Sequence, residues 1–173
     1  MKKISVVTPV YGAPGAVREL AERLTKTLKT LVGDDFEIIF VNDGCPLGSW
    51  QEIRRVTKNN EYVVGVNLSK NFGQHSAIAA GLSKAKGNWV VVMDCDLEDM
   101  PEEIPKLYDA ALAGADVVFG RRVVRQNSFF KKLSSVLFAK VFNYLSGFET
   151  DHSIANFSII SRKVVDSYNQ MPE

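Results

Sequence analysis

The chain has 173 residues, of which 46% are hydrophobic and 24% are charged, and its formal net charge is +1. This length suits one domain with its own hydrophobic core, and the composition is that of an ordinary globular protein. The near-zero charge gives no indication of a nucleic-acid partner, and two cysteines are too few for a disulfide framework. No apolar run reaches the roughly 18 residues of a membrane-spanning helix, so we expect a soluble domain.

Short apolar runs alternate with helical patterns along most of the chain. Strands are predicted at residues 4–10, 36–42, 62–69, 88–94 and 115–120. Helices are predicted between them: one behind Pro14, one from Ser49, one over 74–85 and one that begins at Pro101. Ser49 and Glu52 form a capping-box pattern at the start of the second helix. Because the strands are apolar on both faces, we expect an α/β fold whose mainly parallel central sheet is flanked by helices.

Polar side chains collect where the predicted strands end. They are Thr8, Tyr11, Asn42, Asp43, Ser69, Asn71, Asp94, Asp96 and Arg121. In open α/β sheets, ligands bind beyond the carboxyl ends of the strands, so we expect the functional site at this edge. The first strand is followed by VYGAPGAV, which lacks the GxGxxG spacing, and GxxxxGK[ST] does not occur in the sequence. Nicotinamide and P-loop sites therefore lose their main support.

Asp94 and Asp96 stand two residues apart at the end of a predicted strand. If the chain stays extended, both side chains point the same way, with Cα atoms about 6.5–7 Å apart, and Cys95 points to the opposite side. Such a pair suits one hard cation that is shared with substrate phosphates. The alternative is a solvated acidic turn before the helix at Pro101. The position after a buried strand favours the metal site.

Asp43 ends another strand in the sequence VNDG, which permits two interpretations. The simpler one is an Asx turn in which Gly44 supplies a positive φ. The other is that Asp43, beside Asp94 at a neighbouring strand end, accepts hydrogen bonds from a base or a ribose.

A basic segment follows the fifth predicted strand. There is no acid from Val117 to Phe148, but six cations lie there, and the remaining residues carry 15 cations and 20 acids. Arg121 and Arg122 directly follow the strand, where their guanidinium groups can bind phosphate in a bidentate manner. Residues 128–146 then form a basic, Phe-rich amphipathic pattern. This predicts a helix that either lies in a membrane interface or packs on the sheet with its lysines in water.

Six stretches, taken in order, resemble one known family. They are SVVTPVYG, FVNDG, LSKNFGQHSAIAAGL, VVVMDCDLEDMPEEIP, ADVVFGRR and ISRKVVD. In this order they resemble the nucleotide-diphospho-sugar transferases of glycosyltransferase family 2. In particular they are similar to the polyprenyl-phosphate glycosyltransferase branch, which includes dolichyl-phosphate mannose synthase and its bacterial relatives. The resemblance runs from about Ile4 to Asp166.

This resemblance implies a GT-A fold, a nucleotide-diphospho-sugar donor, Mg²⁺ or Mn²⁺ as the metal, and inversion at the anomeric carbon. The donor-binding residues it implies are Pro9, Tyr11, Asp43, Asn71 and Asp94. The implied metal ligands are Asp96, Asp94 and Glu98, and Arg121, Arg122 and Lys131 are the implied phosphate-binding residues on the acceptor side. Asp94, Asp96 and Arg122 are expected to be the catalytic residues.

The acceptor stays open between two classes. A polyprenyl phosphate is already an oxyanion at pH 7, so it needs cations to position it more than it needs a general base. A saccharide hydroxyl requires a carboxylate base, for which Glu98 or Asp99 is the candidate. A non-catalytic module that binds a nucleotide or a partner is a third possibility, because the stretch ANFSII lacks the arginine of the family's GFR-like pattern.

The resemblance also suggests how the chain is organised in a longer protein. Relatives in this branch continue into transmembrane helices after the catalytic domain. We therefore expect residues 1–173 to be a single catalytic GT-A domain, truncated before such helices. The full-length protein is expected to work at the cytoplasmic face of a membrane.

Overall fold

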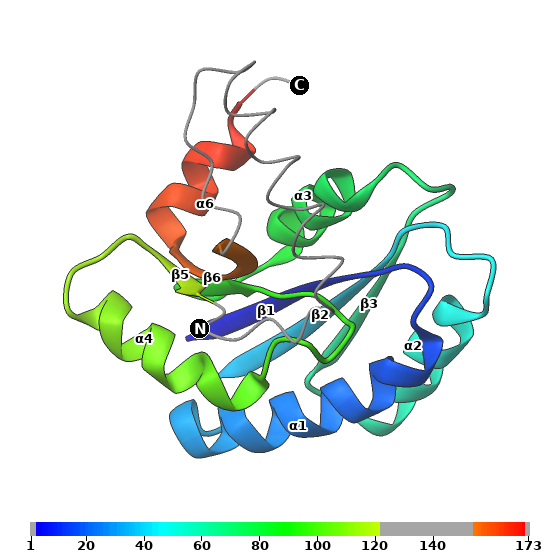
Figure 1. Cartoon of the computed structure of the whole chain (residues 1–173), viewed down its shortest axis with the longest axis horizontal. Helices are drawn as coiled ribbons and strands as arrows, with labels where there is room; N and C mark the ends of the chain where they lie inside the picture. The colour runs from blue at the N-terminus through cyan, green and yellow to red at the C-terminus, as the bar shows by residue number, and fades with distance from the viewer. Residues whose placement is uncertain (1–2, 122–153, 172–173) are drawn as a thin grey trace, which may run out of the picture.

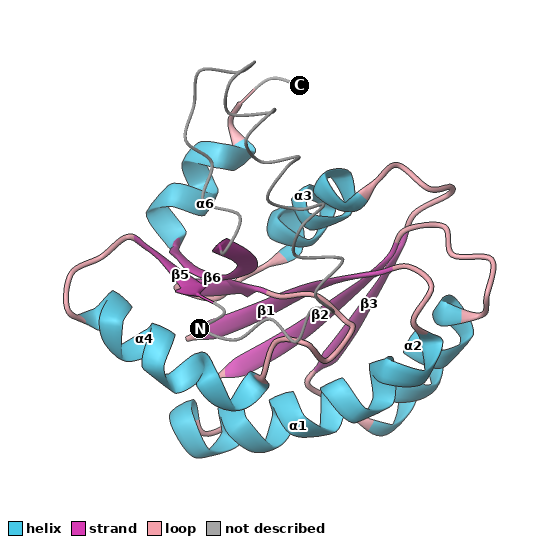
Figure 2. Cartoon of the chain, in the orientation of Figure 1, coloured by secondary structure: helices cyan, strands magenta, loops and turns pink. Residues whose placement is uncertain are grey.

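The computed structural model of the chain describes residues 3–121 and 154–171. Within these ranges, six strands form one sheet in the order β3-β2-β1-β4-β6-β5 (Figure 2). The strands are β1 (Ile4–Val10), β2 (Phe36–Asn42), β3 (Val63–Asn67), β4 (Trp89–Val92), β5 (Val117–Arg121) and β6 (Ile154–Ser161). The helices are α1 (Pro14–Val32), α2 (Ser49–Asn59), α3 (Gln74–Lys84), the 3-10 turn η1 (Pro101–Glu103), α4 (Ile104–Leu112) and α6 (Arg162–Asn169).

The sheet is mainly parallel, as predicted from the apolar strand runs. Strand β1 pairs in parallel with both β2 and β4, and β2 pairs in parallel with β3. Strand β6 is the exception, because it runs antiparallel to both of its neighbours, β4 and β5. As a result, the amino end of β6 lies at the same edge of the sheet as the carboxyl ends of the other strands.

Helices cover both faces of the sheet (Figure 1). On one face, α1, α2 and α4 enclose the larger of two apolar clusters, which contains Leu24, Phe36 and Phe40. On the other face, α3 and α6 enclose a smaller cluster that contains Val7 and Val165. Strands β1 and β2 are buried along their whole length, which explains why their sequences are apolar on both faces.

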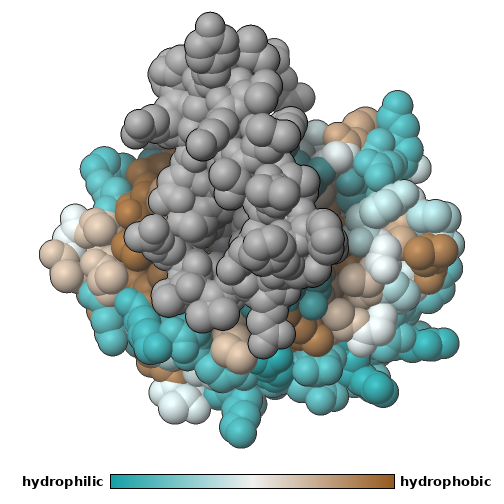
Figure 3. All heavy atoms as spheres, in the orientation of Figure 1, coloured by the Kyte–Doolittle hydropathy of each residue, from teal (hydrophilic) through white to brown (hydrophobic). Residues whose placement is uncertain are grey.

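Helix α1 follows directly from the sequence pattern. Its buried side chains recur at spacings of three and four residues, which is the period that places them on one helical face: Val17, Leu20, Ala21, Leu24, Leu28 and Val32. Pro14 begins the helix, and Gly33 ends it with a φ of 65°. Hydrophilic side chains dominate the lower edge of the molecule in Figure 3, where α1 runs.

Two local predictions differ from the structure. Strand β4 ends at Val92, so Asp94 and Asp96 lie in the bent segment after the strand and not on an extended strand. The capping-box prediction is wrong as well. Helix α2 begins at Ser49, but Gly48 is its N-cap and no side chain caps the helix. The hydroxyl of Ser49 donates instead to the Sγ of Cys45, at 3.1 Å.

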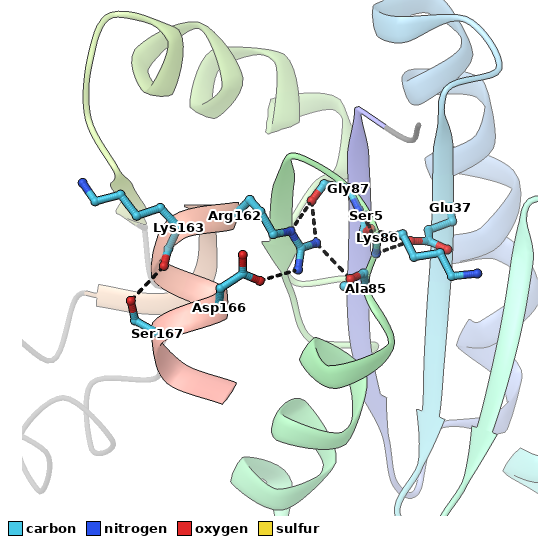
Figure 4. A network of polar contacts seen from close by, with 9 residues as sticks. All are labelled: Ser5, Glu37, Ala85, Lys86, Gly87, Arg162, Lys163, Asp166 and Ser167. Atoms are coloured by element: carbon cyan, nitrogen blue, oxygen red, sulfur yellow. Dashed lines mark hydrogen bonds and ion pairs between the residues drawn. The ribbon is translucent and has the colours of Figure 1, made fainter. Parts of the chain in front are cut away.

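The amino end of the sheet is closed by a buried network of hydrogen bonds (Figure 4). Glu37 Oε1 accepts from the Ser5 hydroxyl and from the backbone N–H of Lys86, both at 2.7 Å. The Ser5 oxygen also accepts from the N–H of Gly87, at 2.8 Å. The guanidinium group of Arg162, the first residue of α6, donates to backbone carbonyls of the same turn between α3 and β4. This network ties α6 and the turn between α3 and β4 to β1 and β2.

None of the helices within residues 3–121 and 154–171 combines the length and the apolar character needed to cross a bilayer. The basic, Phe-rich segment 128–146, for which sequence patterns predict a helix, lies outside the described residues.

Candidate functional site

A cavity of about 360 Å³ opens at the carboxyl edge of the sheet, beyond the ends of β1, β2 and β4. Its volume lies within the range typical of small-molecule sites. Five residues that the sequence placed at this edge line it, together with Pro9, which the family resemblance implied: Tyr11, Asp43, Asn71, Asp94 and Asp96. The predicted donor-binding residues are therefore neighbours in space, although up to 85 positions separate Pro9 from Asp94 in the sequence.

Asp43 is buried, with 3% of its surface exposed, and its carboxylate holds the loop between β3 and α3. Its two oxygens accept the backbone N–H groups of Phe72, at 2.8 Å, and of Gly73, at 3.0 Å. Gly44 lets this loop approach, because a Cβ at Gly44 would lie 2.3 Å from the carbonyl carbon of Lys70. Asp43 thus faces the cavity and at the same time shapes its wall.

Asp94 and Asp96 differ in their surroundings. Asp94 is half-buried, and its Oδ1 accepts from Nε2 of Gln74, at 2.6 Å. Asp96 is exposed, and its Oδ1 accepts the backbone N–H of Glu98, at 2.9 Å. The hydrogen bond from the Glu98 N–H to Asp96 forms an Asx-type turn. Such a turn is also expected from the alternative interpretation of the sequence as a solvated acidic turn.

Cys95, between the two acids, points into the core as predicted. It is 5% exposed and belongs to the larger apolar cluster. Burial, followed by the charges of Asp96 and Asp94, raises the pKa of its thiol to about 12. The burial of Cys95 turns the acids on either side of it away from the core.

The residues at this edge fit a metal ion that is shared with a ligand, and not a complete protein cage. In the described part of the chain, no group of three or more His, Cys, Asp or Glu side chains is arranged to hold a metal. Asp94 and Asp96 nevertheless offer carboxylate oxygens on the border of one cavity. Mg²⁺-type sites commonly use one or two carboxylates and take their remaining ligands from substrate phosphates and water.

Of the three predicted phosphate-binding residues, only Arg121 lies within the described residues. Arg121 is the last residue of β5, and its backbone pairs with Ile154, at the same edge of the sheet as the cavity. Arg122 and Lys131 lie outside the described residues.

Sequence reasoning missed two amide side chains at this site. Gln74, the first residue of α3, lines the cavity and contacts Asp94. Asn156 on β6 brings its Nδ2 to 3.4 Å from both carboxylate oxygens of Asp94. A register argument finds Asn156 only when β6 is known to be antiparallel. Val92, the last residue of β4, pairs with Ser158, so two residues beyond this pair lie Asp94 on one chain segment and Asn156 on the other.

A second cysteine fixes the loops that frame the cavity. The Sγ of Cys45 accepts from the backbone N–H of Gly12, at 3.2 Å, and of Leu47, at 3.4 Å, and from the hydroxyl of Ser49. Burial acts to raise the pKa of this thiol, but the hydrogen bonds from Ser49, Gly12 and Leu47 together outweigh it, so the pKa is lowered. The contact with Gly12 holds the turn that carries Tyr11 against the start of α2.

Comparison with known proteins places this site in context. The model of the family described as "Glycosyl transferase family 2" matches residues 5–168. A protein from Aeromonas hydrophila named undecaprenyl-phosphate 4-deoxy-4-formamido-L-arabinose transferase is 37% identical over 168 residues, which cover 96% of this chain and 51% of that protein. A protein of the same name from Proteus mirabilis is 35% identical and covers 100% of this chain and 53% of its own length. The chain thus spans about half the length of these curated relatives.

Solved structures agree on the fold. A mannosyltransferase from Pyrobaculum calidifontis, in complex with GDP-Man and Mn²⁺, superposes with a TM-score of 0.69 at 16% identity, over 98% of this chain and 47% of that one. Glucosyl-3-phosphoglycerate synthase from Mycobacterium tuberculosis, with Mn²⁺ and UDP, gives a TM-score of 0.67 at 18% identity, over 94% of this chain and 58% of that one. The fold is therefore that of the GT-A glycosyltransferases, as the sequence motifs implied.

Proposed function

Since the chain belongs to glycosyl transferase family 2, we propose that it transfers a sugar from a nucleotide-diphospho-sugar to a polyprenyl phosphate, with inversion at the anomeric carbon. The observation that carries this proposal is the cavity at the carboxyl edge, where Tyr11, Asp43, Asp94 and Asp96 converge. The two curated relatives, which are named as undecaprenyl-phosphate sugar transferases, support the class of acceptor.

The proposed reaction is a single displacement. An oxygen of the acceptor phosphate forms a bond to the anomeric carbon from the face opposite the leaving group. The bond between that carbon and the diphosphate oxygen breaks, and its electron pair leaves with the nucleoside diphosphate. Because the acceptor oxygen is already anionic, no proton has to be removed from it. The chain therefore has to bind and orient the donor and the acceptor more than it has to supply a strong base.

Within this reaction, each residue of the cavity has a proposed task. Pro9, Tyr11, Asn71, Asp43 and Asp94, which all line the cavity, are proposed to bind the donor. Asp96, together with Asp94, would hold a Mg²⁺ or Mn²⁺ ion, and Glu98 is a further candidate ligand. A divalent ion bound there with the diphosphate supplies positive charge against the charge that develops on the leaving group.

The acceptor side rests on the basic segment. Arg121 is the last residue of β5, and Arg122 and Lys131 follow it in the sequence. We propose that these cations receive the acceptor phosphate, because guanidinium groups bind phosphate oxygens in pairs. A polyprenyl acceptor is a membrane lipid, so the longer protein is proposed to act at a membrane surface, on its cytoplasmic face.

A direct transfer assay tests the proposal. The protein is incubated with radiolabelled UDP- or GDP-sugars, Mn²⁺ and undecaprenyl phosphate, and the label is followed into an organic extract. We expect label in the lipid fraction. Asp96→Asn should lower its appearance at least about a hundredfold, because the variant loses a charged metal ligand without changing shape. Asp109→Asn, an equally exposed aspartate on α4, is the matched control and should behave like the wild type.

Three outcomes would contradict the proposal in different ways. Full activity of Asp96→Asn would show that Asp96 does not bind a metal ion that the transfer needs. If the label entered only saccharide products, the acceptor would be a sugar hydroxyl and not a lipid phosphate. A thermal-shift titration in which neither UDP nor GDP, with or without Mn²⁺, stabilises the protein would indicate a module that does not bind the donor, because a ligand at 100 times its Kd stabilises by about 2.7 kcal/mol.

A further inference from the structure

We propose that Gln74 is a positioning residue of the donor cavity, which sets the orientation of the Asp94 carboxylate through its side-chain amide. This inference rests on the proposed function, since it assigns a task to a residue beside the proposed donor. The contact that carries it is the 2.6 Å hydrogen bond from Gln74 Nε2 to Asp94 Oδ1. Both residues line the same cavity, so the bond lies at its wall and not at a distant surface.

The position of Gln74 is set by backbone contacts that precede it. Asp43 binds the N–H groups of Phe72 and Gly73, and Asn71 Oδ1 also accepts from the N–H of Gly73, at 2.9 Å. Gly73 has a φ of 91° and is the N-cap of α3. These contacts fix the two residues directly before Gln74, so the side chain starts from a rigid point.

A chain of contacts therefore spans the end of β1. It starts at Asp43, after β2, passes through Gly73 and Gln74 at the start of α3, and ends at Asp94, after β4. Strands β2 and β4 are the two neighbours of β1 in the sheet, and β1 ends in Pro9 and Val10 below the cavity. These contacts form one wall of the cavity. Within this chain of contacts, the side-chain amide of Gln74 is the group that donates to Asp94.

A second side-chain amide, that of Asn156 on β6, also approaches Asp94. Asn156 Nδ2 lies 3.4 Å from both carboxylate oxygens, which is longer than the 2.6 Å bond from Gln74. Hydrogen bonds weaken with distance over this range, so Gln74 contributes more to the orientation of the carboxylate. Both partners are neutral amides. They fix the direction of the carboxylate without adding a charge of their own.

Such a bond matters because carboxylates that bind a substrate or a metal act through their orientation. When the partner that orients a metal-binding ligand is removed, affinity or activity typically falls about 10- to 100-fold. For Gln74→Leu, which keeps the volume and removes the donor, we expect kcat/KM to fall within that range. The loss should appear as a higher donor KM with kcat largely unchanged, because the bond orients a group that touches the bound donor throughout the reaction.

Gln74→Glu provides a second, sharper variant. It keeps the length of the side chain but places a carboxylate where the amide met Asp94, so like charges face each other. We expect a larger fall in kcat/KM than for Gln74→Leu. Gln51→Leu is the matched control, because Gln51 is also an exposed glutamine in the first turn of a helix, but on α2 and outside the lining of this cavity.

The experiment combines kinetics with binding. Transfer is measured for the wild type, Gln74→Leu, Gln74→Glu and Gln51→Leu, and the Kd of UDP or GDP, whichever the wild type binds, is measured by calorimetry in Mn²⁺. We expect the Kd to rise about 10- to 100-fold in Gln74→Leu and further in Gln74→Glu, with melting temperatures close to that of Gln51→Leu. This order of effects would support the positioning role.

The failure of this inference is distinguishable from that of the proposed function. If the wild type binds neither nucleotide and transfers no sugar, the proposed function fails. If the wild type is active but both Gln74 variants match Gln51→Leu in KM and Kd, the positioning role is overturned and the function stands. If the Gln74 variants change only the melting temperature, Gln74 is a structural residue, which also overturns the proposal.

Discussion

The two ends of β2 use the same device for different purposes. At the amino end, Glu37 accepts the backbone N–H of Lys86, just after α3. At the carboxyl end, Asp43 accepts the N–H groups of Phe72 and Gly73, just before α3. Two buried acids, Glu37 near the start of β2 and Asp43 just after its end, thus hold the two ends of the same helix, because backbone N–H groups that are buried need acceptors.

The surroundings of the two acids differ. At the amino end, the oxygen of Glu37 is shared with Ser5, and Arg162 closes the turn, so the polar groups there satisfy one another (Figure 4). At the carboxyl end, the clamp borders a cavity with an exposed Asp96. The comparison teaches that one end of the sheet uses its polar groups to satisfy one another, whereas the other places polar groups around a cavity.

Two glycine substitutions, one near each end of the sheet, should show the difference between these two ends most strongly. In Gly44→Ala, the new Cβ would meet the backbone of Lys70 at 2.3 Å, and a φ of 61° disfavours alanine. In Gly87→Ala, it would meet the backbone N of Ser5 at 2.5 Å. We expect each to lose about 2–4 kcal/mol of unfolding free energy, measured by urea denaturation. Only Gly44→Ala should also weaken nucleotide binding per folded molecule, because it displaces the loop held by Asp43.

Gly15→Ala is the control for this pair. No atom lies within 4 Å of a Cβ at Gly15, and its φ is not in the left-handed region, so we expect about 0.4–1 kcal/mol of added stability. If Gly87→Ala weakened nucleotide binding as much as Gly44→Ala, the division of tasks between the two ends would be wrong.

A smaller effect is expected when the amino-end clamp is altered alone. Glu37→Leu removes the acceptor of the Ser5 hydroxyl and the nearer acceptor of the Lys86 N–H, which keeps only the Ser5 Oγ at 3.2 Å, and this should cost about 1–3 kcal/mol. For a chain of this size, each kcal/mol corresponds to about 2–4 °C in Tm. Glu37→Gln keeps a carbonyl oxygen at this position and should lose less. Transfer activity per folded molecule should be unchanged in both variants, and a loss of activity would show that the amino end also serves the site.

The smallest effect concerns the two free thiols, Cys45 and Cys95. Hydrogen bonds to Cys45 lower its pKa below that of an ordinary cysteine, against the opposing effect of burial. Its alkylation by iodoacetamide should therefore reach half of its maximal rate at a lower pH than that of a free cysteine. Cys95 is buried and should stay unmodified in the folded protein.

Ser49→Ala removes the hydroxyl that donates to Cys45, so the midpoint for this thiol should move to higher pH. Mass spectrometry of the alkylated peptides identifies which cysteine has reacted. Modification of Cys95 at the rate of Cys45 in native protein would contradict the burial of Cys95.

Much of the fold was predictable because it depends on local periodicity. The bounds of β1 and β2 agree with the apolar runs at 4–10 and 36–42, and α1 follows the spacing of its buried residues. Strand β4 was predicted at 88–94 but ends two residues earlier, at Val92. Its pairing with β1 and β6 stops at Val92, and the chain then bends toward η1 while Met93 and Cys95 remain apolar and buried. An apolar sequence does not mark where pairing stops.

The sequence by itself determined which acids stand at strand ends, because an apolar run that meets a polar residue marks the sheet's edge. It therefore predicted that Asp43, Asp94 and Asp96 would lie together. Only the tertiary structure decided what each acid contacts. Asp43 holds a loop, and Asp94 receives the amides of Gln74 and Asn156. These partners come from a helix end and an antiparallel strand. Their approach depends on how whole elements pack and pair, which no local pattern of residues records.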